Sequence, residues 1–175
     1  MTRKRLLALG AAVLAAGVAA VPFAANAGDA KRIVLTERLQ VTGFVPATGA
    51  GTLAGTFVSA GAVNEAGSVA ARFTLVPVKG GCGRLTGTHV LTGAAGTISV
   101  QTDALACPYP PGVPPRSFVR GRWKVAGGTG AYAGLRGKGR IYATADFATG
   151  LITIARDGKV NSGNRGKDHD DDDDD

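Results

Sequence analysis

One acidic side chain lies where an alternating strand would direct it into a protein core. In the segment RIVLTERLQVT, Glu37 has the parity of the apolar positions and not that of the polar ones. Strict alternation therefore points its carboxylate inward. Because burial raises the pKa of an acid, such a group could act as a general acid or base. The apolar positions that share its parity are Ile33, Leu35, Leu39 and Val41.

His89 is the second candidate for chemistry, because it shares its parity with Leu85 and Leu91 in RLTGTHVLTG. Glu37 and His89 are therefore the candidate catalytic residues, and no cofactor is implied by any motif. Each has a structural alternative. Glu37 could mark a local break of alternation or a position at the rim, and His89 could be a hydrogen-bonded residue of the core or rim.

The sequence contains two cysteines, Cys82 in GGCGRL and Cys107 in LACPYPPG. In an oxidising compartment an isolated pair usually closes, and a disulfide over this separation contributes roughly 3 to 4 kcal/mol. Neither cysteine has a second ligand at metal spacing, so no metal site is expected. No base lies near Cys82 in the sequence, which argues against a cysteine nucleophile. We therefore predict a structural disulfide.

Hydrophobicity alternates with a period of two almost everywhere after Gly28, which indicates strands. Short clusters of Gly, Asn, Asp and Pro separate the alternating segments and leave no room for helices. Closing the sheet would bury its apolar face and remove both edges. The sequence therefore predicts an all-β fold, a closed eight-stranded antiparallel barrel whose lumen is either filled by side chains or holds one small ligand. The eight expected strands are 32–42, 51–61, 68–78, 84–93, 96–104, 117–126, 137–147 and 150–158.

The two ends of the chain differ from its middle. Residues 1–27 combine a basic start, an apolar run and the small-residue site Ala25-Asn26-Ala27, which is the pattern of a secretory signal peptide. We expect a barrel domain over residues 28–160 of an exported, extracellular protein with no retained membrane span. Residues 161–175 end in DHDDDDDD and predict a disordered acidic tail. A bare aspartate run lacks the spacing of a calcium loop.

Glycines crowd the segment WKVAGGTGAYAGLRGKGRI, and we expect them to form a sharp corner between two strands. Gly127, Gly128 and Gly130 would permit positive φ and a tight reversal. Tyr132 and Leu135 would then fold back as an apolar plug. A phosphate-binding loop is disfavoured, because no amphipathic helix and no Gly-Lys-Ser/Thr follows. The corner glycines are Gly127, Gly128, Gly130, Gly134 and Gly137.

The stretch GGTGAYAGLRGKG, residues 127–139, resembles the glycine-rich segment of the allene oxide cyclase and dirigent superfamily. The resemblance covers residues 68–145 and includes ARFTLVPV and GTISVQ. It implies a calycin-like eight-stranded barrel, similar to that of secreted bacterial proteins with an allene oxide cyclase-like domain. It also implies cyclase chemistry and a homotrimer. The acid, asparagine and proline of the plant cyclases have no supported counterpart here, so no catalytic residue is carried over.

Cations alternate with apolar residues on two segments that should be neighbouring strands. Their side chains would form a basic patch on the outer wall, with affinity for anionic envelope polymers that falls as salt rises. Ordinary solubility and edge protection are the alternative. An exported protein with so few aromatic residues near its cations is a poor nucleic-acid binder. The patch comprises Arg120, Arg122, Lys124, Lys138 and Arg140.

Three functions remain open from the sequence. The first is a non-catalytic secreted barrel that binds a small apolar ligand or an envelope component. The second is a cofactor-independent cyclase or isomerase that folds an unsaturated or epoxidised apolar substrate inside the barrel. The third is a structural surface protein that binds anionic envelope polymers through its charged exterior.

Overall fold

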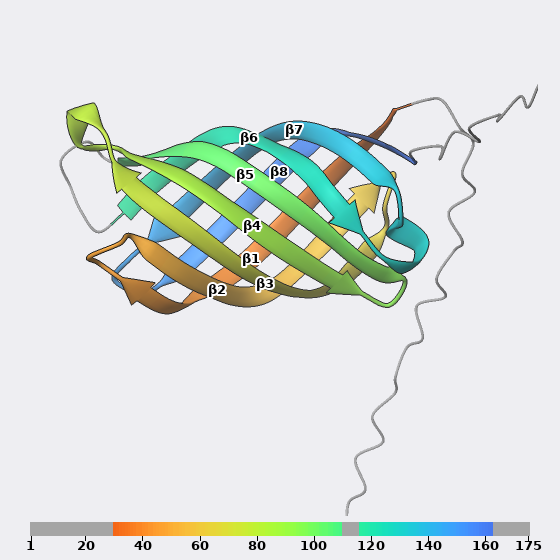
Figure 1. Ribbon diagram of the computed structural model, residues 1–175, viewed down its shortest axis with the longest axis horizontal. Helices are drawn as coiled ribbons and strands as arrows, with labels where there is room; N and C mark the ends of the chain where they lie inside the picture. The colour runs from red at the N-terminus through yellow and green to blue at the C-terminus, as the bar shows by residue number, and fades with distance from the viewer. Residues whose placement is uncertain (1–29, 110–115, 163–175) are drawn as a thin grey trace, which may run out of the picture.

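The computed structural model describes residues 30–109 and 116–162, and in this part of the chain it is all β apart from two three-residue 3-10 turns. Each strand pairs antiparallel with the next, and β8 pairs with β1, so the sheet is a closed barrel (Figure 1). The strands are β1 (Lys31–Val45), β2 (Ala50–Gly61), β3 (Glu65–Pro77), β4 (Gly83–Gly93), β5 (Gly96–Pro108), β6 (Arg116–Gly128), β7 (Leu135–Asp146) and β8 (Leu151–Ser162). The turns are η1 (Lys79–Gly81) and η2 (Gly130–Tyr132). The predicted fold class is confirmed.

Closure depends on the pairing of the first strand with the last. Their register runs from Lys31 opposite Val160 to Gln40 opposite Leu151. This seam hydrogen-bonds both edges that an open eight-stranded sheet would expose. It also places the inward side chains of β1 next to those of β8, and this adjacency positions the polar cluster described below.

Burial alternates along every strand, as the period of two predicts. In β1, for example, positions from Ile33 to Leu39 are buried at every second residue, and the residues between them are exposed. The buried apolar side chains fill the lumen as one core, in which the larger members are Leu35, Leu39, Leu53, Phe57, Phe73, Leu91, Ile98, Trp123, Ile141, Ile152 and Ile154.

The barrel has two distinct ends, which lie left and right in Figure 1. We call the left end, with η1 and the turns β1–β2 and β7–β8, the disulfide end. Cys82 and Cys107 are bonded there, with their Cα atoms 4.3 Å apart, and they join the start of β4 to β5. The predicted disulfide is confirmed. We call the right end, with η2 and the turns β2–β3 and β4–β5, the closed end.

The glycine-rich segment closes its end of the barrel as a plug. The side chain of Tyr132 is buried and donates a hydrogen bond to the Glu65 carboxylate, whose other oxygen accepts the backbone N–H of Ala94 at 2.9 Å. Burial raises the pKa of Tyr132, and the hydrogen bond to Glu65 and the charge of that carboxylate raise it further. Three turns are thereby tied together at the closed end.

The conformations of the corner glycines differ in part from the expectation. Gly130 and Gly134 have φ of 60° and 80°, a region that side chains with a Cβ rarely adopt. Gly127 and Gly128 are not among the residues with positive φ, because both continue strand β6. At Gly137 the constraint is space, since a Cβ would lie 2.5 Å from the side chain of Val160. The reversal itself is made by η2.

Two sequence predictions concern the ends of the chain. The signal peptide and the aspartate run lie outside the described residues. Strand β8 continues to Ser162, two residues past the predicted domain limit of 160. Within residues 30–109 and 116–162, no helix is long and apolar enough to cross a bilayer.

Candidate functional site

The lumen contains a buried polar cluster at mid-height, formed by Glu37, His89, Thr102 and Arg156. Arg156 on β8 donates from Nε to Glu37 Oε1 on β1 at 2.6 Å, and from Nη1 to Thr102 Oγ1 on β5 at 2.8 Å. Glu37 Oε2 lies 2.7 Å from Nδ1 of His89 on β4. Because β1 and β8 are adjacent while β4 and β5 are separated from them by other strands, the cluster crosses the lumen.

The structure brings the two candidate catalytic residues, Glu37 and His89, into direct contact. Their side chains are 0% and 3% exposed, so neither is a rim residue. It adds Arg156 and Thr102, which sequence reasoning missed. The signal for Arg156 was present, because it shares its parity with Ile152 and Ile154 on β8. Whether Glu37 and His89 are catalytic stays a prediction.

The electrostatic balance of the cluster keeps Glu37 ionised. Burial by itself would raise the pKa of this carboxyl. The charge of Arg156, the hydrogen bond and charge of His89 and the hydrogen bond from Arg156 together outweigh burial and lower the pKa to about 2. The expectation of a raised pKa is therefore wrong, because the parity of Glu37 on its own strand does not show that a cation of another strand lies beside it. An ionised Glu37 is a poor general acid at neutral pH and serves instead to orient His89.

His89 is held in a defined orientation by this carboxylate. Nδ1 is engaged by Glu37, so Nδ1 carries a proton, and Nε2 accepts a hydrogen bond only in the neutral form of the ring. The ring lines a cavity, described next. An imidazole that lines a ligand space and is fixed through one nitrogen by a carboxylate is an arrangement that can transfer protons.

An apolar cavity of about 40 Å³ lies between the cluster and the disulfide end. His89 and Thr102 are its only polar lining residues among the described part of the chain. A volume of this size holds about one water molecule or a small alkyl group. A larger ligand would have to displace side chains toward the disulfide end. The apolar lining comprises Leu53, Phe73, Leu75, Leu85, Ala106, Val119, Ile141, Ala143, Ala145, Phe147, Ile152 and Ile154.

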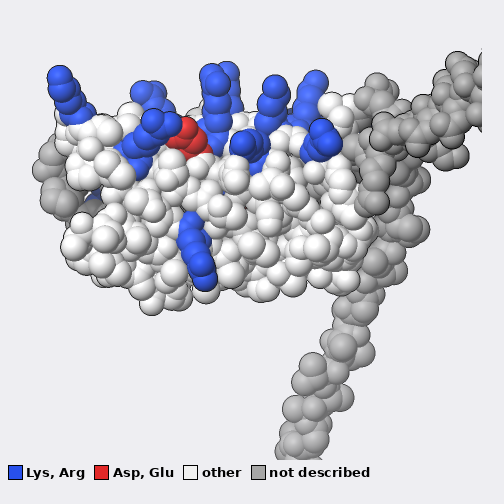
Figure 2. All heavy atoms as spheres, in the orientation of Figure 1, with Lys and Arg blue, Asp and Glu red and all other residues white. Residues whose placement is uncertain are grey.

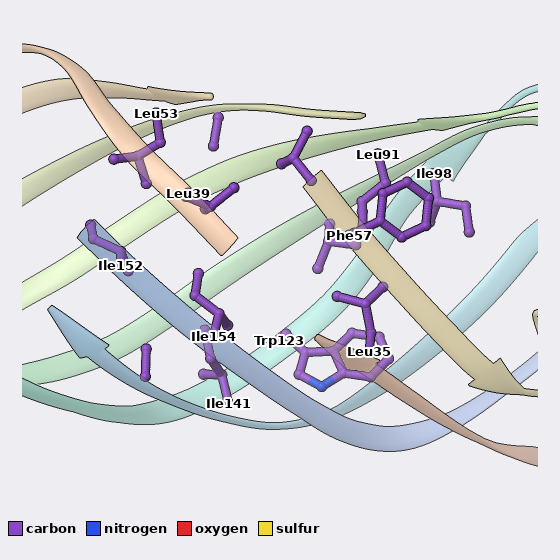
Figure 3. Close-up of a cluster of buried hydrophobic side chains, with 14 of the residues drawn as sticks. Leu35, Leu39, Leu53, Phe57, Leu91, Ile98, Trp123, Ile141, Ile152 and Ile154 are labelled. Carbon is purple, nitrogen blue, oxygen red and sulfur yellow. The ribbon is translucent and has the colours of Figure 1, made fainter. Parts of the chain in front are cut away.

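The core side chains divide into two groups along the barrel (Figure 3). Leu39, Leu53, Ile141, Ile152 and Ile154 lie together in one half, and Leu35, Phe57, Leu91, Ile98 and Trp123 lie together in the other. The second half is packed more tightly, since its cavity measures about 10 Å³. Arg156 lines that smaller cavity, and its Nη2 is buried without a hydrogen-bond partner among the described residues.

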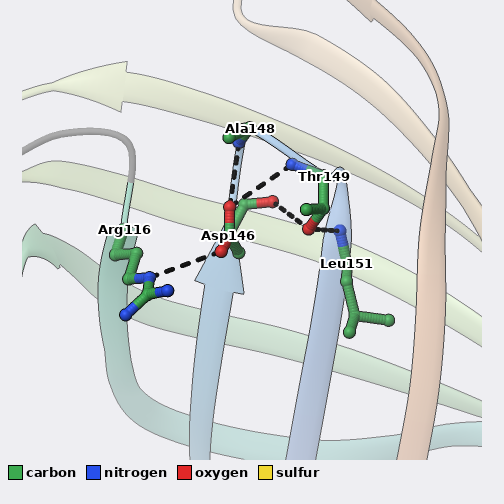
Figure 4. Close-up of polar contacts among 5 residues, drawn as sticks. All are labelled: Arg116, Asp146, Ala148, Thr149 and Leu151. Atoms are coloured by element: carbon green, nitrogen blue, oxygen red, sulfur yellow. Dashed lines mark hydrogen bonds and ion pairs between the residues drawn. The ribbon is translucent and has the colours of Figure 1, made fainter.

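The cavity lining includes Phe147, which lies on the turn between β7 and β8. Figure 4 shows the polar contacts that hold this turn. Asp146 shapes this turn, because its Oδ1 accepts the backbone N–H groups of Ala148 and Thr149 at 3.0 and 3.3 Å. Arg116 donates to the other carboxylate oxygen at 3.3 Å. Phe147 therefore sits on a hydrogen-bonded turn, with 47% of its surface exposed.

Large apolar side chains that remain exposed gather around this same end. They come from the last residues of β1 and β3, from the segments that follow β3, β5 and β7, and from the first residue of β8. We call them the apolar rim, and its members are Phe44, Val45, Val76, Val78, Tyr109, Phe147 and Leu151. Clustered exposed apolar groups mark binding surfaces more often than isolated ones do.

The predicted basic patch lies on the outer wall. Its residues come from β6 and β7, and all are exposed. The space-filling view shows Lys and Arg side chains in a row along one edge of the barrel (Figure 2). The patch is separated from the luminal cluster by the thickness of the wall, because its side chains have the opposite parity. The predicted patch residues are Arg120, Arg122, Lys124, Lys138 and Arg140.

Within the described ranges, no group of three or more His, Cys, Asp or Glu side chains could hold a metal ion. Comparisons with protein-family models, with curated proteins and with solved structures find no match. The barrel architecture thus stands on the structure, whereas the cyclase or dirigent family and the homotrimer stay predictions.

The first prediction concerns the compensation of charge in the lumen. Glu37→Gln should lower the free energy of unfolding by about 3 to 5 kcal/mol, because it leaves the Arg156 guanidinium buried without a counter-charge. The double variant Glu37→Leu/Arg156→Met removes both charges, so its free energy of unfolding should fall considerably less. Urea unfolding at neutral pH measures both values. Equal losses in the two proteins would contradict a charge-compensation role.

The second prediction concerns pH. The folded-state pKa of Glu37, about 2, lies below its ordinary value of 4.5, so its contribution to stability is complete above about pH 4.5 and is lost as pH falls toward 2. The loss should approach roughly 3 kcal/mol. Urea unfolding across this range should therefore show a steeper fall for the native protein than for Glu37→Gln. The surface aspartates are common to both proteins, so their titration affects both profiles equally. Parallel profiles would therefore contradict a contribution from Glu37.

Proposed function

We propose that this protein is an exported, non-catalytic barrel that binds a small apolar molecule at the disulfide end. The observation that carries the proposal is the cavity, which is apolar on its walls and ends on His89 and Thr102. Sites for small molecules commonly combine apolar walls with a few fixed polar groups. The disulfide supports export, because such bonds persist mainly in oxidising compartments.

The polar floor of the cavity defines the chemistry of the ligand. Glu37 and Arg156 already neutralise each other, so an added charge in the lumen would lack a counter-charge. His89 Nε2 can accept a hydrogen bond, and the Thr102 hydroxyl can donate one. The site therefore suits a neutral apolar molecule with one hydroxyl or carbonyl group at its inner end.

The apolar rim provides the entrance. Leu75 and Leu85 are only partly buried, and Phe147 is half exposed, so these side chains are the least restrained part of the cavity wall. Their displacement would enlarge the cavity toward solvent without disturbing the buried cluster. The closed end offers no comparable route, because η2 and Tyr132 plug it.

The third prediction tests ligand binding with a matched series of cyclohexanol, cyclohexanone and cyclohexane. Ligand-observed NMR on the full chain should show saturable binding of the alcohol and ketone, at least tenfold tighter than that of cyclohexane. Ala145→Leu, which fills the cavity wall, should weaken binding at least tenfold.

The control for this experiment is Ala155→Leu, an exposed position on the outer face of β8. It should bind like the native protein. Equal binding of all three probes, or equal effects of the two substitutions, would overturn the proposal. Native mass spectrometry of protein from its secretion medium would show in addition whether a ligand co-purifies and whether the protein is a trimer.

The geometry of His89 favours a second candidate, a cofactor-independent isomerase or cyclase. An imidazole oriented by Glu37 could remove a proton from one carbon of an enclosed substrate at Nε2 and return it to another atom. Such a proton transfer needs no metal or co-reactant. The apolar cavity would hold the substrate in a folded conformation.

The fourth prediction separates catalysis from binding alone. If the protein is an isomerase, the native chain should convert a candidate unsaturated or epoxidised substrate. His89→Gln should then lower the rate of conversion at least a hundredfold. Gas chromatography of the products measures conversion, and urea unfolding confirms that the variant is folded. If the native protein binds these substrates but does not convert them, the isomerase function is contradicted and only ligand binding remains.

A further inference from the structure

The outer wall carries a broad, open hollow across β3 to β7, with a volume of about 1030 Å³. It lies outside the barrel and is separate from the luminal cavity. Four cations of β6 and β7 line one side of it, and Arg72 of β3 lines the other. The four are Arg122, Lys124, Lys138 and Arg140, all members of the predicted basic patch.

Like charges face one another directly in this region. Arg122 is paired with Arg140, and Lys124 with Lys138, across β6 and β7. The second of these pairs continues onto β8, where Lys138 is the cross-strand partner of Lys159. Like charges in opposed positions destabilise a sheet. The fold thus maintains a row of lysines across three strands, at intervals of about 4.8 Å.

Nearby carboxylates do not neutralise this row. Asp103 and Asp157 lie on the two strands that flank β6 and β7, and each is opposite one arginine of the patch. Asp103, however, forms a two-bond ion pair with Arg84, and Asp157 forms one with Arg32. Among the described residues, the four cations of the hollow have no acidic side chain within ion-pair distance.

The rest of the polar lining consists of Asp103, whose carboxylate is paired with Arg84, and of neutral hydrogen-bonding side chains. Thr74, Thr86, Thr88 and Gln101 come from β3, β4 and β5 and contribute hydroxyl and amide groups. Among the residues that the structure describes, no exposed aromatic ring lines it, because Phe73 and Trp123 face inward and are buried. The surface therefore lacks the stacking platforms by which proteins hold single-stranded nucleic acids.

We infer that this hollow binds an acidic polysaccharide. The repeated anionic groups of such a chain would pair with the cations of β6 and β7, and its sugar hydroxyls would bond to the threonines and Gln101. A linear polymer also matches the shape of the site, since the hollow runs across five adjacent strands. Binding of a polyanion would relieve the repulsion between the opposed like charges.

The fifth prediction tests this inference with the full chain and fluorescein-labelled heparin, polygalacturonate and dextran. Fluorescence anisotropy at about 50 mM salt should show binding of both anionic polymers and none of neutral dextran. The dissociation constants should rise steeply with salt, as polyanion binding requires. Lys124→Gln/Lys138→Gln should weaken heparin binding at least tenfold.

The matched control is Arg38→Gln/Lys79→Gln, which removes the same charge from exposed positions outside the hollow. It should change the heparin dissociation constant by less than twofold. An equal loss in both double variants would mean that overall charge alone acts, and would overturn the inference. Failure of the native chain to bind either anionic polymer, or equally tight binding of a labelled oligothymidine, would overturn it as well. None of these results bears on the luminal ligand.

Discussion

A buried carboxylate is the constraint to which the interior of this barrel conforms. Glu37 has no solvent exposure, and a lone ionised carboxylate in such a place would be prohibitively costly. It is tolerated because Arg156 and His89 reach it from β8 and β4, at 2.6 and 2.7 Å. These contacts exist only if β1 and β8 meet at the seam and if β4 lies across the lumen. The charge balance and the closure of the sheet therefore support each other.

The cluster also divides the interior into two parts with different properties. On one side, Trp123, Leu135 and Val160 pack toward the closed end and leave only a very small cavity. On the other side, the cavity is larger, its wall includes partly exposed residues, and the surrounding rim is apolar. A symmetric barrel would offer two equivalent entrances. The tyrosine plug at one end and the turn with Phe147 at the other make the two ends unlike.

Much of this architecture follows from sequence periodicity, because the pleat of a strand fixes which side chains share a face. The eight strands, the inward direction of Glu37 and His89 and the outward direction of the basic patch could all be predicted. The contact between Glu37 and His89 could not, since β1 and β4 are not neighbours and parity says nothing about distance across a lumen. Arg156 was missed for a related reason: a cation at an inward position is improbable until its acidic partner is known.

The same alternation keeps the lumen and the outer wall separate. On β6, the inward Trp123 stands between the outward Arg122 and Lys124, so one short segment contributes to both regions. Gly139 and Gly158 let the neighbouring strands approach the indole, and a Cβ at either would come within 2.7 Å of it. Packing inside thus fixes the backbone from which the outer cations project. Changes to the outward side chains leave that packing intact, whereas a larger residue at either glycine would disturb both faces together.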